Sequence, residues 1–323
     1  MDNDRCFLCG TLSDSISQEH VFPKWLQHRY KLWDQRLVLL NNSMIQYRNL
    51  RIPCCSICNN QPLSRLEAVI SSAVASGYEA CLEIDDHLWY LWAGKLFYGV
   101  LRKELSLPLD RTQPRNGGII SEAALKSFAS LQLFLQGIRA AHIFSGMSPY
   151  SVLICNIHDL GQKFNFSFRD SFPYMTLAIR MGEIGIIVAF EDAGITSSSF
   201  GRYVANVNGR KIHPLQFDEL YAKVTYQLSL ITGGLQYLTS ETNSDRRKTQ
   251  VFDNIFLRDW SQEYFSTVLR AHVSQWLRST ADDVQWFVPP NLVPTWMTDP
   301  EGGLLLLPLS TWQKQSGANK LIL

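Results

Sequence analysis

Hydrophobic residues recur at helical spacing in several stretches of the chain. After Pro62 they stand at Leu63, Leu66, Ile70 and Val74, three or four positions apart, which predicts an amphipathic helix that begins at the proline. Residues 86–105 are apolar on nearly every side, which is typical of a helix inside a core. The other predicted helices cover residues 23–30, 121–144, 215–231 and 252–277.

Alternating apolar and polar positions predict strands in two regions. In the first, Asn41-Asn42-Ser43 is typical of a hairpin turn between strands at 37–40 and 45–52. The alternation changes phase at Arg48-Asn49, which indicates a bulge or a break in the second strand. Further on, the pattern predicts a hairpin turn at Asn208-Gly209, an exposed loop over 240–250, and antiparallel strands at 151–157, 164–168, 174–179 and 184–190.

These elements predict an α+β protein in several parts. A polar stretch from Pro108 to Gly118 contains Pro114 and Gly117-Gly118, and its composition predicts a linker. We therefore expect a first domain over residues 1–75 and a helical extension over 76–110. A C-terminal domain of mixed helices and antiparallel sheet then covers residues 119–323.

Composition narrows the class of protein. The 323 residues are 46% hydrophobic and 18% charged, which is typical of a globular chain. The net charge of +1 excludes a global basic field, so any surface for nucleic acid must be local. The start has no apolar run, and the most apolar stretch, His87–Leu101, is interrupted by Lys95 and too short to span a bilayer. We expect a cytoplasmic protein without a membrane partner, where cysteines bind metal instead of forming disulfides.

Four of the seven cysteines form two Cys-x-x-Cys pairs, Cys6 with Cys9 and Cys55 with Cys58. Two such pairs supply the four thiolates of a tetrahedral zinc site. A zinc ribbon has roughly 15 to 20 residues between its pairs, whereas forty-five separate Cys9 from Cys55. Cys54 is expected to be a buried thiol outside the site.

The long insert and the residue after the second pair carry candidate chemistry. Glu19-His20 lies in the insert, and Asn59 follows Cys58 directly. Metal-assisted phosphodiester hydrolysis needs a base for water and ligands for a cation. The imidazole of His20 suits the base, and the oxygens of Glu19 and Asn59 suit Mg²⁺ or Mn²⁺. Glu67 lies two helical turns beyond Asn59, so we expect a structural salt bridge there.

Taken together, Cys6-x-x-Cys9, Glu19-His20-Val-Phe-Pro and Cys55-x-x-Cys58-Asn59 resemble the zinc-stapled branch of the HNH endonucleases, whose core is a ββα-metal fold. The resemblance covers residues 5–67, about a fifth of the chain. It implies that His20 is the general base, that Glu19 and Asn59 hold a catalytic Mg²⁺ or Mn²⁺, and that the cysteines hold a separate structural zinc.

The sequence departs from the family at two positions and leaves a third open. The first position of the family is often aspartate or histidine and the last is often histidine, so Glu19 and Asn59 are variants that still offer oxygen. The middle asparagine, which orders the loop between the strands, is Asn49 by its distance to the second cysteine pair. Asn41 and Asn42, at the hairpin turn, remain alternatives.

The resulting hypothesis is an endonuclease that hydrolyses DNA, and the resemblance places such proteins in bacterial restriction or anti-phage defence. RNA is an open alternative substrate, because the chemistry attacks phosphate in either case. The alternative class is a catalytically silent zinc module that binds nucleic acid or a partner protein. The C-terminal domain is expected to supply regulation, target choice or docking to a partner protein.

Overall fold

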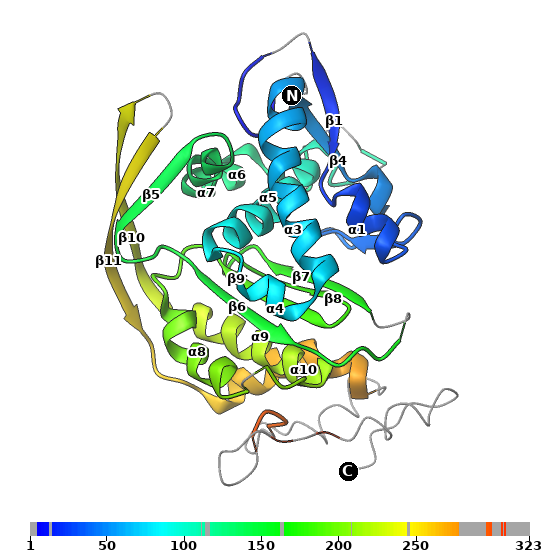
Figure 1. The fold of residues 1–323 in the computed structure, drawn as a ribbon, viewed down its shortest axis with the longest axis vertical. Coiled ribbons are helices and arrows are strands. Elements are labelled where there is room, and N and C mark those ends of the chain that lie inside the picture. Colours follow the sequence, from blue (N-terminus) through cyan, green and yellow to red (C-terminus); the bar gives the residue numbers. More distant parts are fainter. Residues whose placement is uncertain are drawn as a thin grey trace. The chain divides into compact units, whose positions relative to one another are not determined.

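The computed structural model describes residues 5–12, 15–110, 112–113, 117–161, 165–207, 209–243, 246–277, 295–298, 305 and 307. The chain forms two compact units. The first consists of Met1–Gly146 and Tyr237–Gln250, and the second of Met147–Gln236 and Val251–Leu323. Both contain helices and antiparallel strands (Figure 1), so the protein is α+β, as the sequence predicts.

The first unit is built around α5 (Asp86–Ser106), and every residue of α5 from Trp89 to Leu101 is buried. This confirms the predicted core helix. Gly99 permits the closest approach, because a Cβ there would lie 2.9 Å from a methyl carbon of Val21. Figure 1 shows α3 beside α5. The helices of this unit that surround or precede α5 are α1 (Lys24–Arg29), α3 (Ser64–Ser76), α4 (Tyr78–Leu82), α6 (Glu122–Lys126) and α7 (Ala129–Phe134).

The N-terminal part of this unit contains two short antiparallel ladders. As predicted, β2 (Arg36–Val38) and β3 (Met44–Gln46) form a hairpin. The predicted strand over 45–52 is interrupted at its phase change by a 3-10 turn, Tyr47–Asn49. The chain beyond this turn, β4 (Arg51–Cys55), pairs instead with β1 (Ile16–His20) in an antiparallel ladder. No local pattern predicted β1, because its partner lies more than thirty residues away along the chain.

The helix that carries the second cysteine pair begins earlier than predicted. It starts with α2 (Ser56–Cys58), passes through a π-helical turn (Asn59–Leu63) and continues as α3. Pro62 lies inside the π-helical turn and does not open the helix. The Sγ atom of Cys55 accepts the backbone N–H of Cys58 at 3.5 Å and so caps the N-terminus ahead of the proline.

The predicted helix over 121–144 is wrong. The structure has α6 and α7, a 3-10 turn (Leu135–Ile138), and then β5 (Ala141–Gly146). The strand forms because β5 pairs with β11 (Arg246–Leu257), a contact between distant segments that local pattern does not reveal. The units divide at Gly146 and not within the predicted linker at 108–118, since α6 and α7 pack against α5.

The second unit contains the predicted antiparallel sheet, in the order β6-β9-β8-β7. All residues of β8 and β9 are buried. Phe217, Leu220 and Val224 of α9 (Pro214–Ser229) pack on Leu153 and Ile187 of the sheet. Its strands are β6 (Ser151–Asn156), β7 (Phe166–Ser171), β8 (Thr176–Met181) and β9 (Ile184–Ala189).

Helices α8 (Ile195–Val207) and α10 (Gln262–Leu277) complete the second unit, with α8 against β6 and α10 against α9. The helix predicted over 252–277 therefore begins late, because residues up to Leu257 belong to β11. The loop predicted over 240–250 belongs instead to a hairpin of β10 (Ile231–Asn243) and β11. Of the predicted Asn208-Gly209 turn, Asn208 lies outside the described residues. Within the described residues, no helix is long and apolar enough to cross a bilayer.

Candidate functional site

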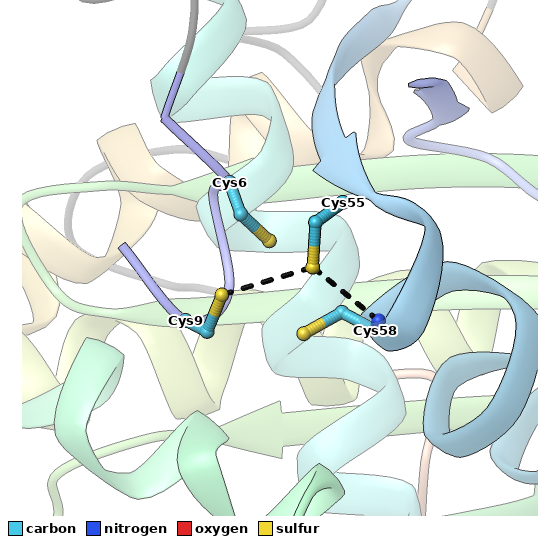
Figure 2. Close-up of side chains that lie close together, drawn as sticks. All are labelled: Cys6, Cys9, Cys55 and Cys58. Atoms are coloured by element: carbon cyan, nitrogen blue, oxygen red, sulfur yellow. Dashed lines mark hydrogen bonds between the residues drawn. The ribbon is translucent and has the colours of Figure 1, made fainter. Parts of the chain in front are cut away.

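Four cysteine side chains from two distant segments converge in the first unit. Cys6 and Cys9 lie in a turn that is closed by a 2.9 Å hydrogen bond from the Gly10 N–H to the Cys6 carbonyl. Cys55 ends β4, and Cys58 ends α2. The four Sγ atoms lie within 4.8 Å of one another, and Figure 2 shows the side chains turned toward a common centre.

This group fits a structural zinc ion. The Sγ atoms of Cys9 and Cys55 are 3.8 Å apart, and a tetrahedral ion with Zn–S bonds of about 2.3 Å separates two sulfurs by about 3.8 Å. Side-chain hydrogen bonds between Cys6 and the thiols of Cys54 and Cys58 hold the pKa of Cys6 well below its usual range. Four thiols, three of them buried, could therefore hold a metal ion. Cys54 is buried, as predicted, and is not one of the four.

The strand β1 carries the Glu19-His20 pair at its end. Alternation along the strand puts Ser17 and Glu19 on one face of the ladder and Gln18 and His20 on the other. Cross-strand partners share a face, so the side chain of His20 lies beside that of Arg51. The carboxylate and the imidazole therefore project from opposite faces at the same end of the ladder.

A buried lysine of α5 holds the Glu19 carboxylate. The Nζ atom of Lys95 donates to Glu19 Oε1 at 2.9 Å and to Glu67 Oε1 at 2.8 Å. It also lies 2.7 Å from the His20 carbonyl oxygen and 3.0 Å from that of Val21. The Lys95 side chain is fully buried. One ammonium group thus fixes both a side chain and the backbone of the Glu19-His20 pair.

The charges in this cluster depend on one another. Burial alone would lower the pKa of Lys95, but the carboxylates of Glu67 and Glu19 outweigh it and raise that pKa above its usual value. Burial likewise raises the pKa of Glu67, and the Lys95 ammonium opposes this effect. The predicted salt bridge of Glu67 is confirmed. Its partner Lys95 is shared with Glu19, which the sequence did not indicate.

The imidazole of His20 is buried and uncharged near neutral pH. Burial, and then the positive charge of Arg51, lower the pKa of His20 to about 4, so the ring is neutral at pH 7. Among the described residues, the buried Nε2 atom has no hydrogen-bond partner. An orphaned buried nitrogen is uncommon and marks a place for a water molecule or a ligand. The ring of Trp33 lies 5.8 Å from that of His20 and stacks on the exposed His28 at 5.1 Å.

The third predicted residue, Asn59, lies on the Glu19 face of the ladder. Its Nδ2 atom donates to Ser17 Oγ at 3.0 Å, and Ser17 in turn donates to the Cys54 carbonyl at 2.9 Å. Ser17 and Glu19 are two positions apart on the same face. Within the described part of the chain, no hydrogen bond joins Asn59 to Glu19 or His20. The structure therefore brings these residues to adjacent elements but not into contact.

Of the three candidate asparagines, Asn41 makes the contacts expected of a loop-ordering residue. Its Oδ1 atom accepts the N–H and the hydroxyl of Ser43 at 3.1 and 2.7 Å, and its Nδ2 donates to the Leu109 carbonyl at 2.9 Å. Asn42 adopts a left-handed conformation with φ of 60°. The amide of the exposed Asn49 makes one long contact of 3.4 Å with Gln46.

Sequence reasoning did not identify Lys95 or Arg51 as part of this site. Lys95 had a recognisable signal, because a single charge within thirteen consecutive buried positions of α5 must find carboxylate partners. Arg51 had none, since its position beside His20 follows from the β1–β4 register. Comparison with known protein families, with curated proteins and with solved structures found no match.

Proposed function

We propose that the first unit is a metal-dependent nuclease with a ββα-metal core of the HNH type, and that it hydrolyses phosphodiester bonds in DNA. The observation that supports this most is local connectivity. The strand ending in Glu19-His20 pairs with β4, and β4 leads directly into the cysteine pair and the helix of Asn59. His20, Glu19 and Asn59 thus lie on neighbouring elements of one ββα unit, with Glu19 and His20 on opposite faces at the same end of the ladder, beside four cysteines that could hold a metal ion.

In the proposed reaction, neutral His20 accepts a proton from water as the water oxygen bonds to phosphorus. The bond from phosphorus to the leaving oxygen then breaks, and that oxygen takes a proton from solvent. A bound divalent ion would supply positive charge to the scissile phosphate and the leaving oxygen. Glu19, whose Oε1 atom is held by Lys95, would offer its other oxygen to that ion, and the carbonyl oxygen of Asn59 would complete the protein ligands.

A second candidate function is a silent zinc module that binds nucleic acid or a partner protein. The Lys95–Glu19 ion pair favours it, because a carboxylate already paired with an ammonium group does not require a metal ion. The two functions differ in what they ask of Glu19. A nuclease needs its charge, whereas a structural role needs only an acceptor for the Lys95 hydrogen bond.

The test is cleavage of labelled DNA duplexes by full-length protein with Mg²⁺ or Mn²⁺, with RNA in a parallel arm. His20→Ala should lower the rate by about 10²–10⁴-fold, the usual contribution of a general base. His28→Ala is the matched control, because this exposed histidine stacks on the same Trp33 ring. Glu19→Gln keeps an acceptor for Lys95 and should still lose cleavage, with partial recovery at high Mn²⁺.

Cleavage by His20→Ala at the wild-type rate would refute the assignment of the base. Absence of cleavage by the wild-type protein on either nucleic acid, with both metals, would favour the silent module. Cleavage of RNA alone would keep the mechanism and change the substrate.

A further inference from the structure

A cavity of the first unit is lined by more basic than acidic side chains. It has a volume of about 560 Å³ and is bordered by β1, β4, α5, α6 and α7. Five cationic side chains line it, against one carboxylate, in a chain whose net charge is only +1. The charged lining residues are Arg5, Arg51, Arg102, Lys103, Lys126 and Glu122.

Four of these cations, Arg51, Arg102, Lys103 and Lys126, have no carboxylate partner in the described part of the chain. Burial and the nearby charge of Arg51 both lower the pKa of Lys103. The protein thus gathers like charges that repel one another, and an anionic ligand would relieve this repulsion.

The cavity opens on the face of the β1–β4 ladder that carries His20. Gln18 and Pro53, which line it, are cross-strand partners, and Arg51, which also lines it, is the partner of His20. Directly opposed residues of an antiparallel ladder project from the same face, with Cβ atoms about 5 Å apart. The basic cavity and the candidate base are therefore neighbours on one surface.

We propose that this cavity binds the phosphates of a nucleic-acid strand and leads that strand to His20. The proposal rests on the proposed nuclease function. The lining favours a strand backbone over a free nucleotide. Tyr98 is the one aromatic residue among the described lining residues, and its ring is buried, so no exposed ring is offered to stack on a base. Arginine and lysine contacts to phosphate give affinity without sequence preference.

The experiment measures binding without chemistry. Full-length His20→Ala protein is titrated with a fluorescent oligonucleotide, single-stranded or duplex, over a range of salt concentrations. Adding Arg102→Gln and Lys126→Gln should weaken binding by at least about tenfold and reduce the slope of log K against log salt by about two, one for each lost phosphate contact. The control adds Arg36→Gln and Arg65→Gln, two exposed arginines outside the cavity, and should leave most of the slope unchanged.

A salt slope that falls equally in both double variants, or no measurable binding by the His20→Ala parent, would overturn the proposal. Lys126→Glu is a further check. Because this residue is exposed, the substitution should spare the fold and still weaken oligonucleotide binding. A competition arm with a mononucleotide and with inorganic phosphate tests the other source of the anion. If the cavity substitutions weaken binding of the mononucleotide but not of the oligonucleotide, the cavity does not bind the backbone of a nucleic-acid strand.

The two proposals fail in distinguishable ways. If the Arg102 and Lys126 substitutions reduce the salt slope but the wild-type protein cuts no nucleic acid, the cavity binds a strand and the nuclease proposal is wrong. If cleavage depends on His20 but these substitutions leave the salt slope unchanged, the nuclease proposal stands and the cavity proposal is wrong.

Discussion

Each unit buries a charged cluster, and the two clusters are satisfied in different ways. In the first unit, the Lys95 ammonium is shared between the carboxylates of Glu19 and Glu67. In the second unit, the fully buried Glu219 of α9 pairs with Lys223 at 2.8 Å. It also accepts hydrogen bonds from the Thr295 hydroxyl at 2.5 Å and from the Trp296 backbone N–H at 2.7 Å.

The difference shows which cluster depends on a single cation. Glu219 retains two hydrogen-bond donors if Lys223 is removed. Glu19 and Glu67 would instead be left as two like charges in a partly buried place, with no ammonium between them. A buried charge that loses its partner is costly, whereas one that keeps other donors is not. The first cluster therefore depends on Lys95 alone, whereas the second is also held by the hydrogen bonds from Thr295 and Trp296 to Glu219.

The largest expected effect is the loss of the metal centre. Cys58→Ser should abolish zinc binding and unfold the first unit, because structural zinc contributes on the order of 10 kcal/mol. Cys155→Ser, a buried thiol of β6 in the second unit, is the control and should cost only about 1–3 kcal/mol. Elemental analysis and limited proteolysis, with cleavage sites mapped to each unit, provide the measurement. Folded wild-type protein without zinc would contradict the prediction.

The comparison of the two clusters is tested by removing each lysine. Lys95→Met should lower the free energy of unfolding by about 3–5 kcal/mol, since it leaves two carboxylates unpaired. Lys223→Met should cost about 1 kcal/mol, because this lysine is partly exposed and its partner keeps its other donors. Urea unfolding of both variants gives the two values. Equal losses would show that the clusters do not differ as described.

The next effect concerns acid stability and His213, which caps α9. Its Nδ1 atom accepts the Leu215 N–H at 3.0 Å. Burial, followed by the nearby His158 and Arg180, lowers the pKa of His213 to about 3. The unfolded chain takes up this proton near pH 6.5, so the contribution is complete above that pH and is lost as the pH falls toward 3.

His213→Asn removes the ionisation and keeps an N-terminal cap. Between pH 7.5 and pH 4, the wild-type protein should lose about 3 kcal/mol more stability than this variant. Urea unfolding at the two pH values measures the difference, and near-equal stability at pH 7.5 confirms that the cap survives. A parallel loss in both proteins would show that another group controls acid unfolding.

The smallest effect is expected at an exposed ion pair of the first unit, between Arg48 and Asp34. The two side chains are 37% and 74% exposed, so water and salt screen their attraction. Arg48→Gln should change the free energy of unfolding by less than about 1 kcal/mol, and less still in high salt. If Arg48→Gln lowered the free energy of unfolding as much as Lys95→Met, burial would not determine how much an ion pair contributes to stability.

Local signals in the sequence predicted several features correctly. The spacing of Cys6, Cys9, Cys55 and Cys58 predicted that these side chains converge in a group that could hold a metal ion, because two cysteine pairs can supply four thiols to one ion even when they are far apart in the chain. The apolar pattern of α5 predicted a core helix, and the turn residues at 41–43 predicted the β2–β3 hairpin. The core helix and the hairpin depend on residues that are close together in the chain, and the cysteine group depends on one kind of interaction, the binding of thiols to a metal ion.

Contacts between distant segments decided the remainder. The pairing of β1 with β4, and of β5 with β11, required three strands, β1, β5 and β11, that no local pattern distinguished from loop or helix. The sequence indicated that Lys95 interrupts an apolar stretch, but only the packing of α5 beside β1 and α3 selects Glu19 and Glu67 as its partners.

The sequence by itself therefore determined the four cysteines that could hold a metal ion, the α+β class and the residues able to perform the proposed chemistry. The tertiary structure decided which elements and which charges surround those residues, such as Lys95 beside Glu19 and Arg51 beside His20. The physical reason is that residue type and spacing fix local geometry and ligand chemistry. Burial, register and electrostatic environment arise only when segments far apart in the chain are brought together.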